Sequence, residues 1–265
     1  MNNLIQPPLL DEVITAHGGR EGWDRVRTLE CRLRFIGRLL ALKFLSPRLR
    51  HIHVKVDARQ LRSVLEDFPR PGVRGVFEPD RVWLETSDGV LIGERRIARD
   101  SAGRVLRRRV WDDFDLLYFF GYVAWNYLFT PYLFLLPGFK CHEVAPRREA
   151  DGSVWRGLQV CYPLGFPAHC REQTLYFAAD GLLRRLDYTA EVFSPLARGA
   201  HYTEQHKSYD GLVFPTYRRV FMRGPGGRPL RAMAVLEGWI DDVIVHWQDR
   251  QPPSTTPSID KERYA

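Results

Sequence analysis

Apolar residues follow helical spacing near the start of the chain and strand spacing over most of the rest. Residues 9–17 carry apolar side chains three and four positions apart, which is typical of an amphipathic helix. Gly18 and Gly19 follow directly and favour the left-handed conformation in which many helices end. After residue 28 the period changes to two, and the apolar positions of 29–35 alternate with Glu and Arg. This alternation predicts a strand with one buried face.

Segments with strand periodicity continue through the chain, and turn dipeptides separate them. Asp-Gly between two apolar runs is a strong hairpin signal, and it occurs at 88–89, 151–152, 180–181 and 210–211. In the first half of the chain we expect strands at 29–35, 52–56, 61–65, 82–84 and 90–92. In the second half we expect strands at 155–162, 172–177, 182–188, 201–209, 213–223 and 231–240, with a short last strand at 243–247.

The segment 116–139 has no charged residue and is rich in Phe, Tyr and Trp. It is long enough to span a bilayer. However, it contains Gly121, Asn126 and two prolines, and three aspartates precede it, where the N-terminal end of a helix favours negative charge. We therefore favour a buried helical plug or lid, place an element at the lipid interface second, and place a true membrane span last.

These elements together predict an α+β fold. About ten or eleven antiparallel strands would form a single strongly curved sheet, an unclosed barrel, covered by the N-terminal helix and the internal aromatic helix. No shift in composition divides the chain, so we expect one half-barrel domain over 1–250, with an aromatic helical insertion at 111–139. The segment 251–265 is rich in Pro, Ser and Thr without periodicity, and we expect it to be a disordered tail.

Composition narrows the functional classes. The chain has 265 residues, 39 Lys and Arg against 32 Asp and Glu, and a formal net charge of +7. Its arginines are scattered between apolar strand positions and form no single basic stripe, so we do not expect nucleic-acid binding. The four cysteines (31, 141, 161 and 170) have no C-x-x-C spacing, which disfavours a zinc ribbon or a thioredoxin-like motif. The first residues lack a signal-peptide pattern, and we expect a cytoplasmic protein with reduced thiols.

Two short motifs carry a resemblance to a known family. The N-terminal helix ends in Ala-His-Gly-Gly at 16–19 and is followed by Trp23, and a late strand pair contains Tyr-Asp-Gly-Leu-Val-Phe-Pro-Thr at 209–216. In these features the chain resembles the LolA/LolB-like fold, over residues 9–37 and 171–245. The resemblance implies an unclosed antiparallel barrel that wraps a helix and presents a hydrophobic cavity.

The known members of the family narrow the functions that we expect of this chain. It includes periplasmic lipoprotein carriers, many uncharacterised bacterial proteins and the cofactor-free enzyme of the violacein pathway. The chain departs from the carriers in lacking an export-signal pattern and in inserting the aromatic segment 111–139. We therefore do not expect a lipoprotein-sorting role, and what the resemblance implies is a fold with an apolar cavity.

Histidine, tyrosine and carboxylate side chains gather on the predicted strands of the second half. A histidine titrates near neutral pH and can act as acid or base, while Tyr and Arg can hold an enolate or a carboxylate. The candidate catalytic residues are His169, His201, His206, Tyr176, Tyr188, Glu172 and Asp187. The alternative is that these side chains form solvated cross-strand pairs on an outer face, each contributing a few tenths of a kcal/mol.

Strand periodicity assigns the candidates to faces. On 172–177, Glu172 and Tyr176 share one face, opposite Gln173. On 201–206, Tyr202, Glu204 and His206 share one face, opposite His201. Because Asp180-Gly181 closes a hairpin, we expect Tyr176 and Glu172 to lie near Arg185 or Asp187.

Aromatic residues of the inserted segment predict a ligand wall, because a few polar anchors among aromatic rings suit a rigid apolar ligand. Asp112 or Asp113 would cap the inserted helix. The candidate ligand-binding residues are Trp111, Trp125, Asn126, Tyr127, Tyr202 and Arg219. The alternative is a filled core without a pocket.

The sequence contains no motif for metal binding, nucleophilic catalysis or phosphate binding. The histidine spacings do not bring three metal ligands to one strand face, no nucleophile motif is present, and the glycines at 224–227 lie between strands and not before a helix. We expect no metal and no cofactor.

The preferred hypothesis is a cofactor-independent enzyme that binds a hydrophobic small molecule and acts on it by acid–base chemistry, as a cyclase or isomerase of a biosynthetic pathway. The alternative is a non-catalytic carrier of a lipid or lipophilic metabolite, and a membrane-surface protein held by 116–136 is the third. The oligomeric state has no signature in the sequence.

Overall fold

The structure is a computed structural model that describes residues 7–38, 51–97, 110–230 and 234–248. Three α-helices lie in these ranges, α1 (Pro8–Ala16), α2 (Arg20–Trp23) and α5 (Asp113–Phe129), with short 3-10 helices η2 (Tyr132–Leu135) and η3 (Pro225–Gly227). The strands are β1 (Val26–Ile36), β2 (His51–Asp57), β3 (Ser63–Glu66), β4 (Val73–Glu78), β5 (Arg81–Thr86), β6 (Leu91–Arg96), β7 (Lys140–Arg148), β8 (Val154–Cys161), β9 (Glu172–Phe177), β10 (Leu183–Thr189), β11 (Arg198–Tyr209), β12 (Leu212–Met222) and β13 (Leu236–Trp247).

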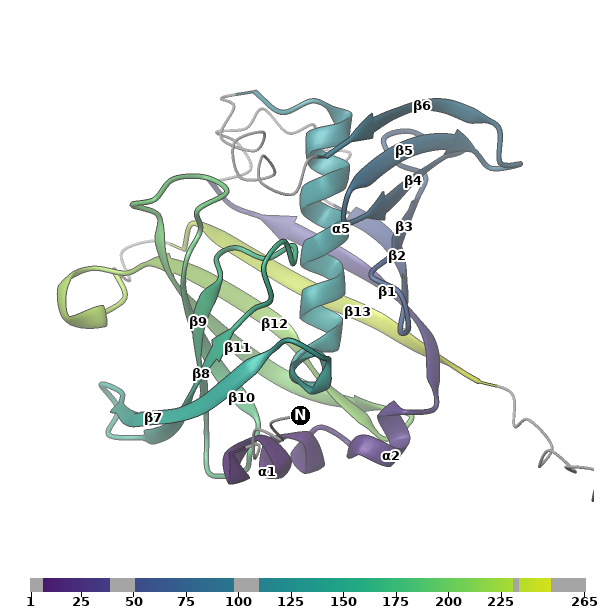
Figure 1. Cartoon of the computed structure of the whole chain (residues 1–265). Helices are drawn as coiled ribbons and strands as arrows, with labels where there is room; N and C mark the ends of the chain where they lie inside the picture. Colours follow the sequence, from purple (N-terminus) through teal and green to yellow (C-terminus); the bar gives the residue numbers. More distant parts are fainter. Residues whose placement is uncertain (1–6, 39–50, 98–109, 231–233, 249–265) are drawn as a thin grey trace, which may run out of the picture.

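All thirteen strands form one antiparallel sheet in the order β6-β5-β4-β3-β2-β1-β13-β12-β11-β10-β9-β8-β7. The first six strands make one half and the last seven make the other, and the two halves join where β1 pairs with β13 (Figure 1). The edge strands β6 and β7 do not pair with each other. The sheet is therefore a single unclosed sheet, as the sequence predicts.

Two details of the predicted fold are wrong. The sheet has thirteen strands and not ten or eleven, because β4 and β7 were not predicted. β7 is an edge strand exposed on both faces, so it has no apolar alternation to detect. The sheet is also not strongly curled, and α5 lies against one of its faces.

Helix α5 lies against one face of the sheet (Figure 1). Nearly all of its side chains are buried, and its apolar residues surround the helix axis with little amphipathic bias, as in helices enclosed by protein on all sides. Asp112 and Asp115 form a capping box at its start, and Arg95 donates to both carboxylates. The predicted buried helix, with Asp112 as its cap, is confirmed. None of the described helices combines the length and the apolar character that crossing a membrane requires.

An aromatic contact joins the two N-terminal helices to the end of α5. Trp23 of α2 stacks on Tyr132 of η2 with ring centroids 4.2 Å apart, and Phe129 of α5 meets Trp23 edge-on. The Tyr132 hydroxyl donates to the carbonyl of His17 at 2.5 Å, and the amide of Val213 on β12 donates to the same carbonyl at 2.8 Å. Helix α1 therefore lies across the end of the sheet (Figure 1), and the prediction that the N-terminal helix covers the face of the sheet is a third wrong detail.

The disordered tail predicted for 251–265 lies outside the described residues, as do 231–233 of the predicted strand 231–240. The remainder of that segment and 243–247 form a single strand, β13. The domain boundary at residue 250 stays a prediction.

The contact between α5 and β4 gives a stability test at Gly121. A Cβ atom at this position would lie 2.4 Å from the Cβ of Phe77, so Gly121→Ala forces a backbone or ring shift in the core. We expect a loss of about 1–3 kcal/mol in the free energy of unfolding, measured by urea denaturation. Gly93→Ala is the matched control, because its added Cβ would meet Phe114 at an ordinary 3.5 Å. Equal stability of the two variants would show that α5 does not pack on β4 as described.

Candidate functional site

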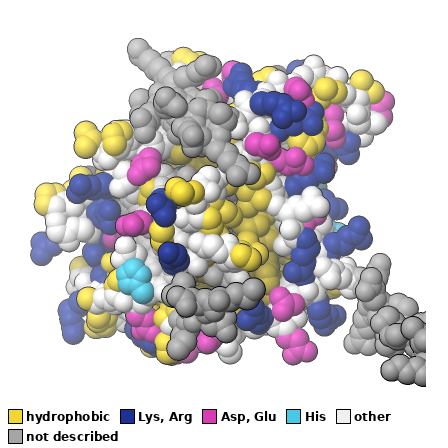
Figure 2. Space-filling model, in the orientation of Figure 1, with side chains coloured by type: hydrophobic (Ala, Val, Ile, Leu, Met, Phe, Trp, Pro, Cys, Tyr) yellow, Lys and Arg dark blue, Asp and Glu magenta, His cyan; other side chains and the backbone are white. Residues whose placement is uncertain are grey.

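An apolar cavity of about 280 Å³ lies between α5 and strands β10 to β13. We call it the inner cavity. Phe119 and Tyr127 of α5 form one wall, and Val220 of β12 and Leu236 of β13 form the other. The lining is almost entirely hydrocarbon, and it includes the exposed side chain of Met222, so the cavity reaches the surface at this end. Figure 2 shows hydrophobic side chains gathered in the middle of the face where α5 runs.

The rings of His169 and Tyr188 line this cavity, and the ring of Tyr122 lies next to His169. His169 stacks on Tyr188 with ring centroids 4.6 Å apart, and its Nδ1 lies 3.0 Å from the hydroxyl oxygen of Tyr122. Burial among these rings lowers the pKa of His169 from 6.5 to about 4. Burial also raises the pKa of Tyr188 well above its ordinary value. Both side chains are therefore uncharged at neutral pH.

Behind these rings lie the buried side chains of His201 and Arg218 and the partly buried side chain of Asn126, which we call the buried polar cluster. They surround a void of about 20 Å³, whose lining also includes Tyr127 and Tyr188. The Asn126 amide nitrogen donates to the carbonyls of Tyr122 and Pro167 at 2.8 and 3.0 Å. Burial, and next the positive charge of Arg218, keep the pKa of His201 well below its usual range.

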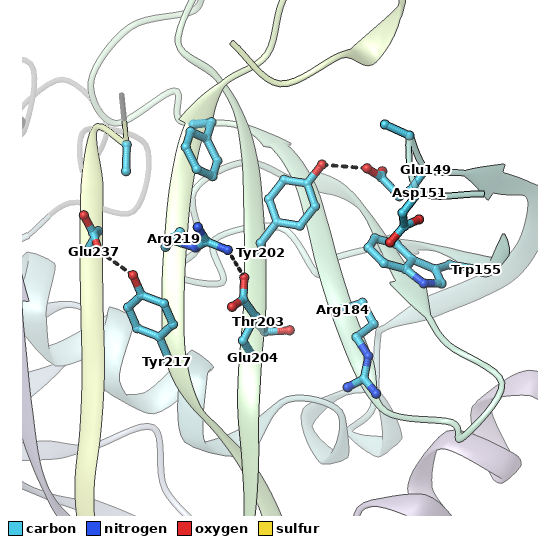
Figure 3. Close-up of a pocket in the computed structure, with 13 residues that line it drawn as sticks. Glu149, Asp151, Trp155, Arg184, Tyr202, Thr203, Glu204, Tyr217, Arg219 and Glu237 are labelled. Carbon is cyan, nitrogen blue, oxygen red and sulfur yellow. Dashed lines mark hydrogen bonds and ion pairs between the residues drawn. The ribbon is translucent and has the colours of Figure 1, made fainter. Parts of the chain in front are cut away.

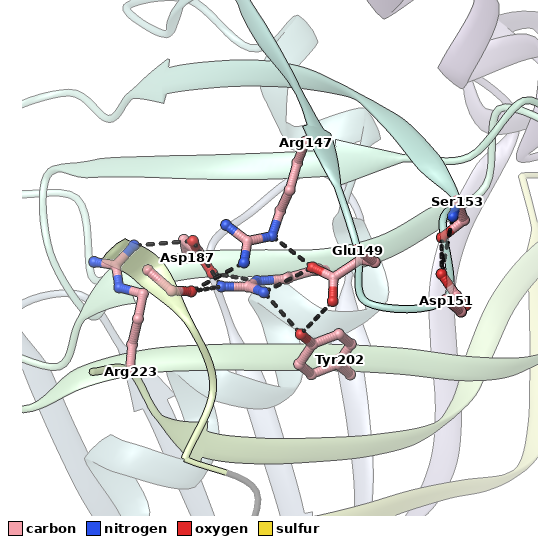
Figure 4. Close-up of polar contacts among 9 residues, drawn as sticks. Arg147, Glu149, Asp151, Ser153, Asp187, Tyr202 and Arg223 are labelled. Atoms are coloured by element: carbon pink, nitrogen blue, oxygen red, sulfur yellow. Dashed lines mark hydrogen bonds and ion pairs between the residues drawn. The ribbon is translucent and has the colours of Figure 1, made fainter. Parts of the chain in front are cut away.

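The opposite face of the sheet carries a buried ion-pair network centred on Arg185 (Figure 4). Arg185 is fully buried, and its Nε and Nη2 donate to the two carboxylate oxygens of Asp187 at 2.6 and 3.1 Å. Its Nη1 donates to Glu149 at 2.9 Å and to the Tyr202 hydroxyl at 2.7 Å. The carbonyl of Gly227 in η3 accepts a further bond at 2.7 Å. Every donor of this guanidinium group has an acceptor, so the network fastens η3 and the β7–β8 hairpin to the sheet.

Beside this network lies a more polar groove of about 530 Å³, which we call the outer groove (Figure 3). Its charged side chains pair with one another: Arg219 forms an ion pair with Glu204, and the Tyr217 hydroxyl donates to Glu237. Trp155 lines the groove on the side of Asp151 and Glu149, away from Tyr217 and Glu237. The outer groove is larger than the inner cavity, but pairing within the chain already satisfies its charges.

The structure separates the predicted catalytic residues into three places. His169 and Tyr188 line the inner cavity, and His201 belongs to the buried polar cluster. Glu172, Tyr176 and Asp187 lie on the other face of the sheet, where Tyr176 is paired in register with Arg185, as predicted. His206 is the exception and lies at none of these three places.

His206 contacts the N-terminal helix. Its ring centroid is 6.5 Å from that of His17, and its Nδ1 is 3.0 Å from Nη1 of Arg184. The preceding Gln205 has a φ of 54°, although the pairing of β11 with β12 keeps its register from Glu204 to His206. Alternation along one strand does not show that His206 lies beside the N-terminal helix.

The predicted ligand-binding residues are also divided among the inner cavity, the buried polar cluster, the core and the outer groove. Tyr127 lines the inner cavity, Asn126 lies in the buried polar cluster, and Trp111 stacks on Phe193, a cavity residue. Trp125 instead packs in the core, where it stacks on Phe129 and donates to the carbonyl of Asp57 at 3.0 Å. Tyr202 and Arg219 line the outer groove.

Sequence reasoning selected Arg219 and missed its neighbour Arg218 as a candidate for the inner face. Strand alternation could have distinguished them, because Arg218 shares a face with Thr216 and Val220, whereas Arg219 shares one with Tyr217 and Phe221. Phe119 and Phe193 were missed for another reason: the sequence does not show which of many aromatic residues will border a void and which will fill the core. In the described part of the chain, no group of three or more His, Cys, Asp or Glu side chains is arranged to hold a metal ion.

Comparison with solved structures finds similar folds at low sequence identity. A DUF1329 family protein from Desulfovibrio piger has a TM-score of 0.49 and 13% identity, with 89% of this chain and 91% of that chain covered. A LolA superfamily protein from Nitrosomonas europaea has a TM-score of 0.49 and 9% identity, with 91% and 94% covered. At these identities and TM-scores the similarity says nothing of ligand or activity. No family model matches the chain, and no curated protein matches it.

The Arg185 network predicts that replacing Arg185 destabilises the protein much more than replacing Arg219. Arg185→Leu removes the central cation and leaves the buried carboxylates of Asp187 and Glu149 with only Arg223 and Arg147 as partners, and we expect a loss of about 3 kcal/mol in the free energy of unfolding. Arg219→Leu is the matched control, because the Arg219–Glu204 pair is partly exposed and contributes about 1 kcal/mol or less. Urea denaturation measures both variants. Similar losses would contradict the assignment of the network as a structural clamp.

Buried histidines predict that the protein loses stability in acid. Burial lowers the pKa values of His17, His169 and His206 from 6.5 to about 4. Between these two pH values the unfolded chain binds protons that the folded chain excludes. The free energy of unfolding therefore falls as the pH decreases from 6.5 to 4, and above 6.5 these groups have no effect on it.

His17 gives the direct test, because its side chain has no exposed surface. Its share of the loss is up to about 3 kcal/mol. We expect His17→Gln to flatten the profile of unfolding free energy measured between pH 4 and 7. His51→Gln removes an exposed histidine and serves as the control. A profile for His17→Gln as steep as that of the unaltered protein would refute the linkage.

Proposed function

We propose that this protein binds one lipophilic small molecule in the inner cavity and holds it without chemical change, as a carrier. The observation that supports the proposal most is the inner cavity itself, an almost purely hydrocarbon space that reaches the surface near Met222. Apolar surface facing a space of this kind is stabilised by an apolar ligand, because the ligand removes water from both surfaces. A polar ligand would lose its own hydration without gaining partners.

The volume limits the ligand to a modest size. Small-molecule pockets usually measure about 300–1,000 Å³, and the inner cavity, at about 280 Å³, lies just below that range. A single acyl chain or a small ring system matches this space better than the several chains of a lipoprotein anchor. The proposed ligand is therefore one lipophilic metabolite or a single-chain lipid.

Acid–base catalysis has less support in this site than binding. A general base is most effective when its pKa lies near the working pH, whereas burial lowers the pKa of His169 to about 4 and that of His201 well below its usual range. Of the other candidates, Glu172, Tyr176 and Asp187 lie on the far face of the sheet. The polar side chains at the cavity are placed to orient a ligand more than to move its protons.

Filling the cavity tests the proposal. Ala197 lines the inner cavity and its neighbour Leu196 is 79% exposed, so Ala197→Phe fills the space and Leu196→Phe is the matched control. The probe is the neutral lipophilic fluorophore N-phenyl-1-naphthylamine, titrated by fluorescence. We expect Ala197→Phe to weaken binding at least tenfold and Leu196→Phe to leave it unchanged. Equal affinity in both variants, or no binding by the unaltered protein, would overturn the proposal.

Mass spectrometry separates a carrier from an enzyme. A ligand extracted from the purified protein, returned to it and incubated should be recovered with its mass and chromatographic retention time unchanged. A product with a new mass or retention time that depends on His169 would instead favour the acid–base alternative.

A further inference from the structure

Arg218 is a buried cation to which the described part of the chain supplies no anionic partner. It lies on β12, it is 3% exposed, and its guanidinium group stands 4.2 Å from the centre of the Tyr127 ring. Nη2 donates to the carbonyl of Tyr127 at 3.2 Å, and Nε has no hydrogen-bond partner. Among the described residues, no carboxylate forms a salt bridge with it. Burial lowers the pKa of Arg218 to about 10, so the group keeps its charge at neutral pH.

A second unsatisfied group lies beside it. The side chain of His201 is fully buried, and neither of its ring nitrogens has a hydrogen-bond partner among the described residues. His201 and Arg218 both line the void of about 20 Å³ in the buried polar cluster. A void of this size holds about one water molecule or one oxygen atom of a ligand. The protein therefore keeps a cation and a neutral imidazole, with unused hydrogen-bonding capacity, around a small polar space.

This polar space adjoins the inner cavity. Tyr127, His169 and Tyr188 line both, so the three rings form the partition between them. On one side of the partition the surface is hydrocarbon, and on the other side it is cationic. A ligand that occupies both spaces must be apolar along its body and anionic at one end.

We propose that the inner cavity takes an amphipathic carboxylate, with its apolar body in the cavity and its carboxylate paired with Arg218 and hydrogen-bonded to His201. The proposal rests on the carrier function above and specifies its ligand class. A carboxylate is planar and can place one of its two oxygens in this space, where it accepts a charge-assisted hydrogen bond from Arg218, whereas a tetrahedral phosphate headgroup is bulkier. Entry of the carboxylate requires rotation of Tyr188 or His169, the stacked pair in the partition.

The cost of the unpaired cation supports this assignment. A charge buried without a counter-ion destabilises a folded protein, and the network around Arg185 shows that this chain pairs a buried arginine where the pairing serves the fold. An arriving carboxylate would provide the missing counter-charge in a site that is already desolvated. The free energy released by that pairing then contributes to ligand affinity.

A matched pair of ligands tests the proposal with the full chain. Decanoate and 1-decanol share an alkyl body and differ in the charge of the head, and their dissociation constants are measured at pH 8 by displacement of N-phenyl-1-naphthylamine. We expect decanoate to bind at least tenfold more tightly than 1-decanol. Arg218→Met should abolish this preference while leaving the affinity for 1-decanol unchanged. Arg219→Met, the neighbouring arginine on the outer face, should retain the preference.

Two further measurements keep the outcomes distinct. Arg218→Lys retains the charge without the planar fork and should show an intermediate preference, and thermal unfolding of each variant without ligand reports whether it folds. Equal binding of decanoate and 1-decanol would overturn the carboxylate assignment and leave the carrier function standing. Failure of both ligands and of the fluorophore would overturn the carrier function. Acetate that stabilises the protein as much as decanoate does would identify a site for small free anions and overturn the amphipathic ligand.

Discussion

The burial of α5 is the constraint on which the rest of the structure depends. Its apolar side chains surround the axis, so no single packing surface can cover it. The sheet packs along one side of the helix, η2 and the N-terminal helices close its end through Trp23 and Tyr132, and Arg95 holds its start. The inner cavity exists because the large rings of α5 and the smaller residues of β11 and β12 do not fill the remaining space completely. The site is thus a by-product of how the helix is enclosed.

The two faces of the sheet differ in whether their buried arginine is paired with carboxylates. On the outer face Arg185 is surrounded by Asp187, Glu149 and Tyr202, and its charge is neutralised within the chain. On the inner face Arg218 contacts the backbone carbonyl and the aromatic ring of Tyr127. Arg185 lies on β10 and Arg218 on β12 of the same sheet. They differ in pairing because each face of the sheet provides different partners. Among the described residues, the buried arginine of one face has anionic partners and that of the other face has none.

The sequence predicts the coarse fold well, because the signals it uses are local. Strand alternation and the Asp-Gly turns locate most strands, and the change from helical to strand spacing after residue 28 agrees with the start of β1. The edge strand β7 lacked a signal, since both of its faces meet solvent. Strand curvature was overestimated, because the size of the helix that the sheet must accommodate is a property of tertiary packing.

The site was harder to predict, since it depends on contacts between elements distant in the chain. His169 and Tyr188 were selected for their chemistry and do lie at the inner cavity, whereas Tyr202 and Arg219 have the same chemistry and lie on the other face. Residue type alone does not distinguish these cases. His206 lies beside His17 at the end of the N-terminal helix, a contact between distant parts of the chain that no periodic pattern anticipates.

The pairing of β1 with β13 has a consequence for how the chain reaches its native state. These strands lie near opposite ends of the described sequence, and their pairing is the only seam between the two halves of the sheet. During synthesis β1 and α5 emerge long before β13, so the aromatic surface of α5 and one edge of β1 stay uncovered until the last strand arrives. Contacts of such long sequence separation form slowly, and exposed apolar surface and unpaired strand edges promote aggregation in the interval. The order of strands in the sheet thus leaves the edge of β1 without its partner until the last strand of the chain has been made.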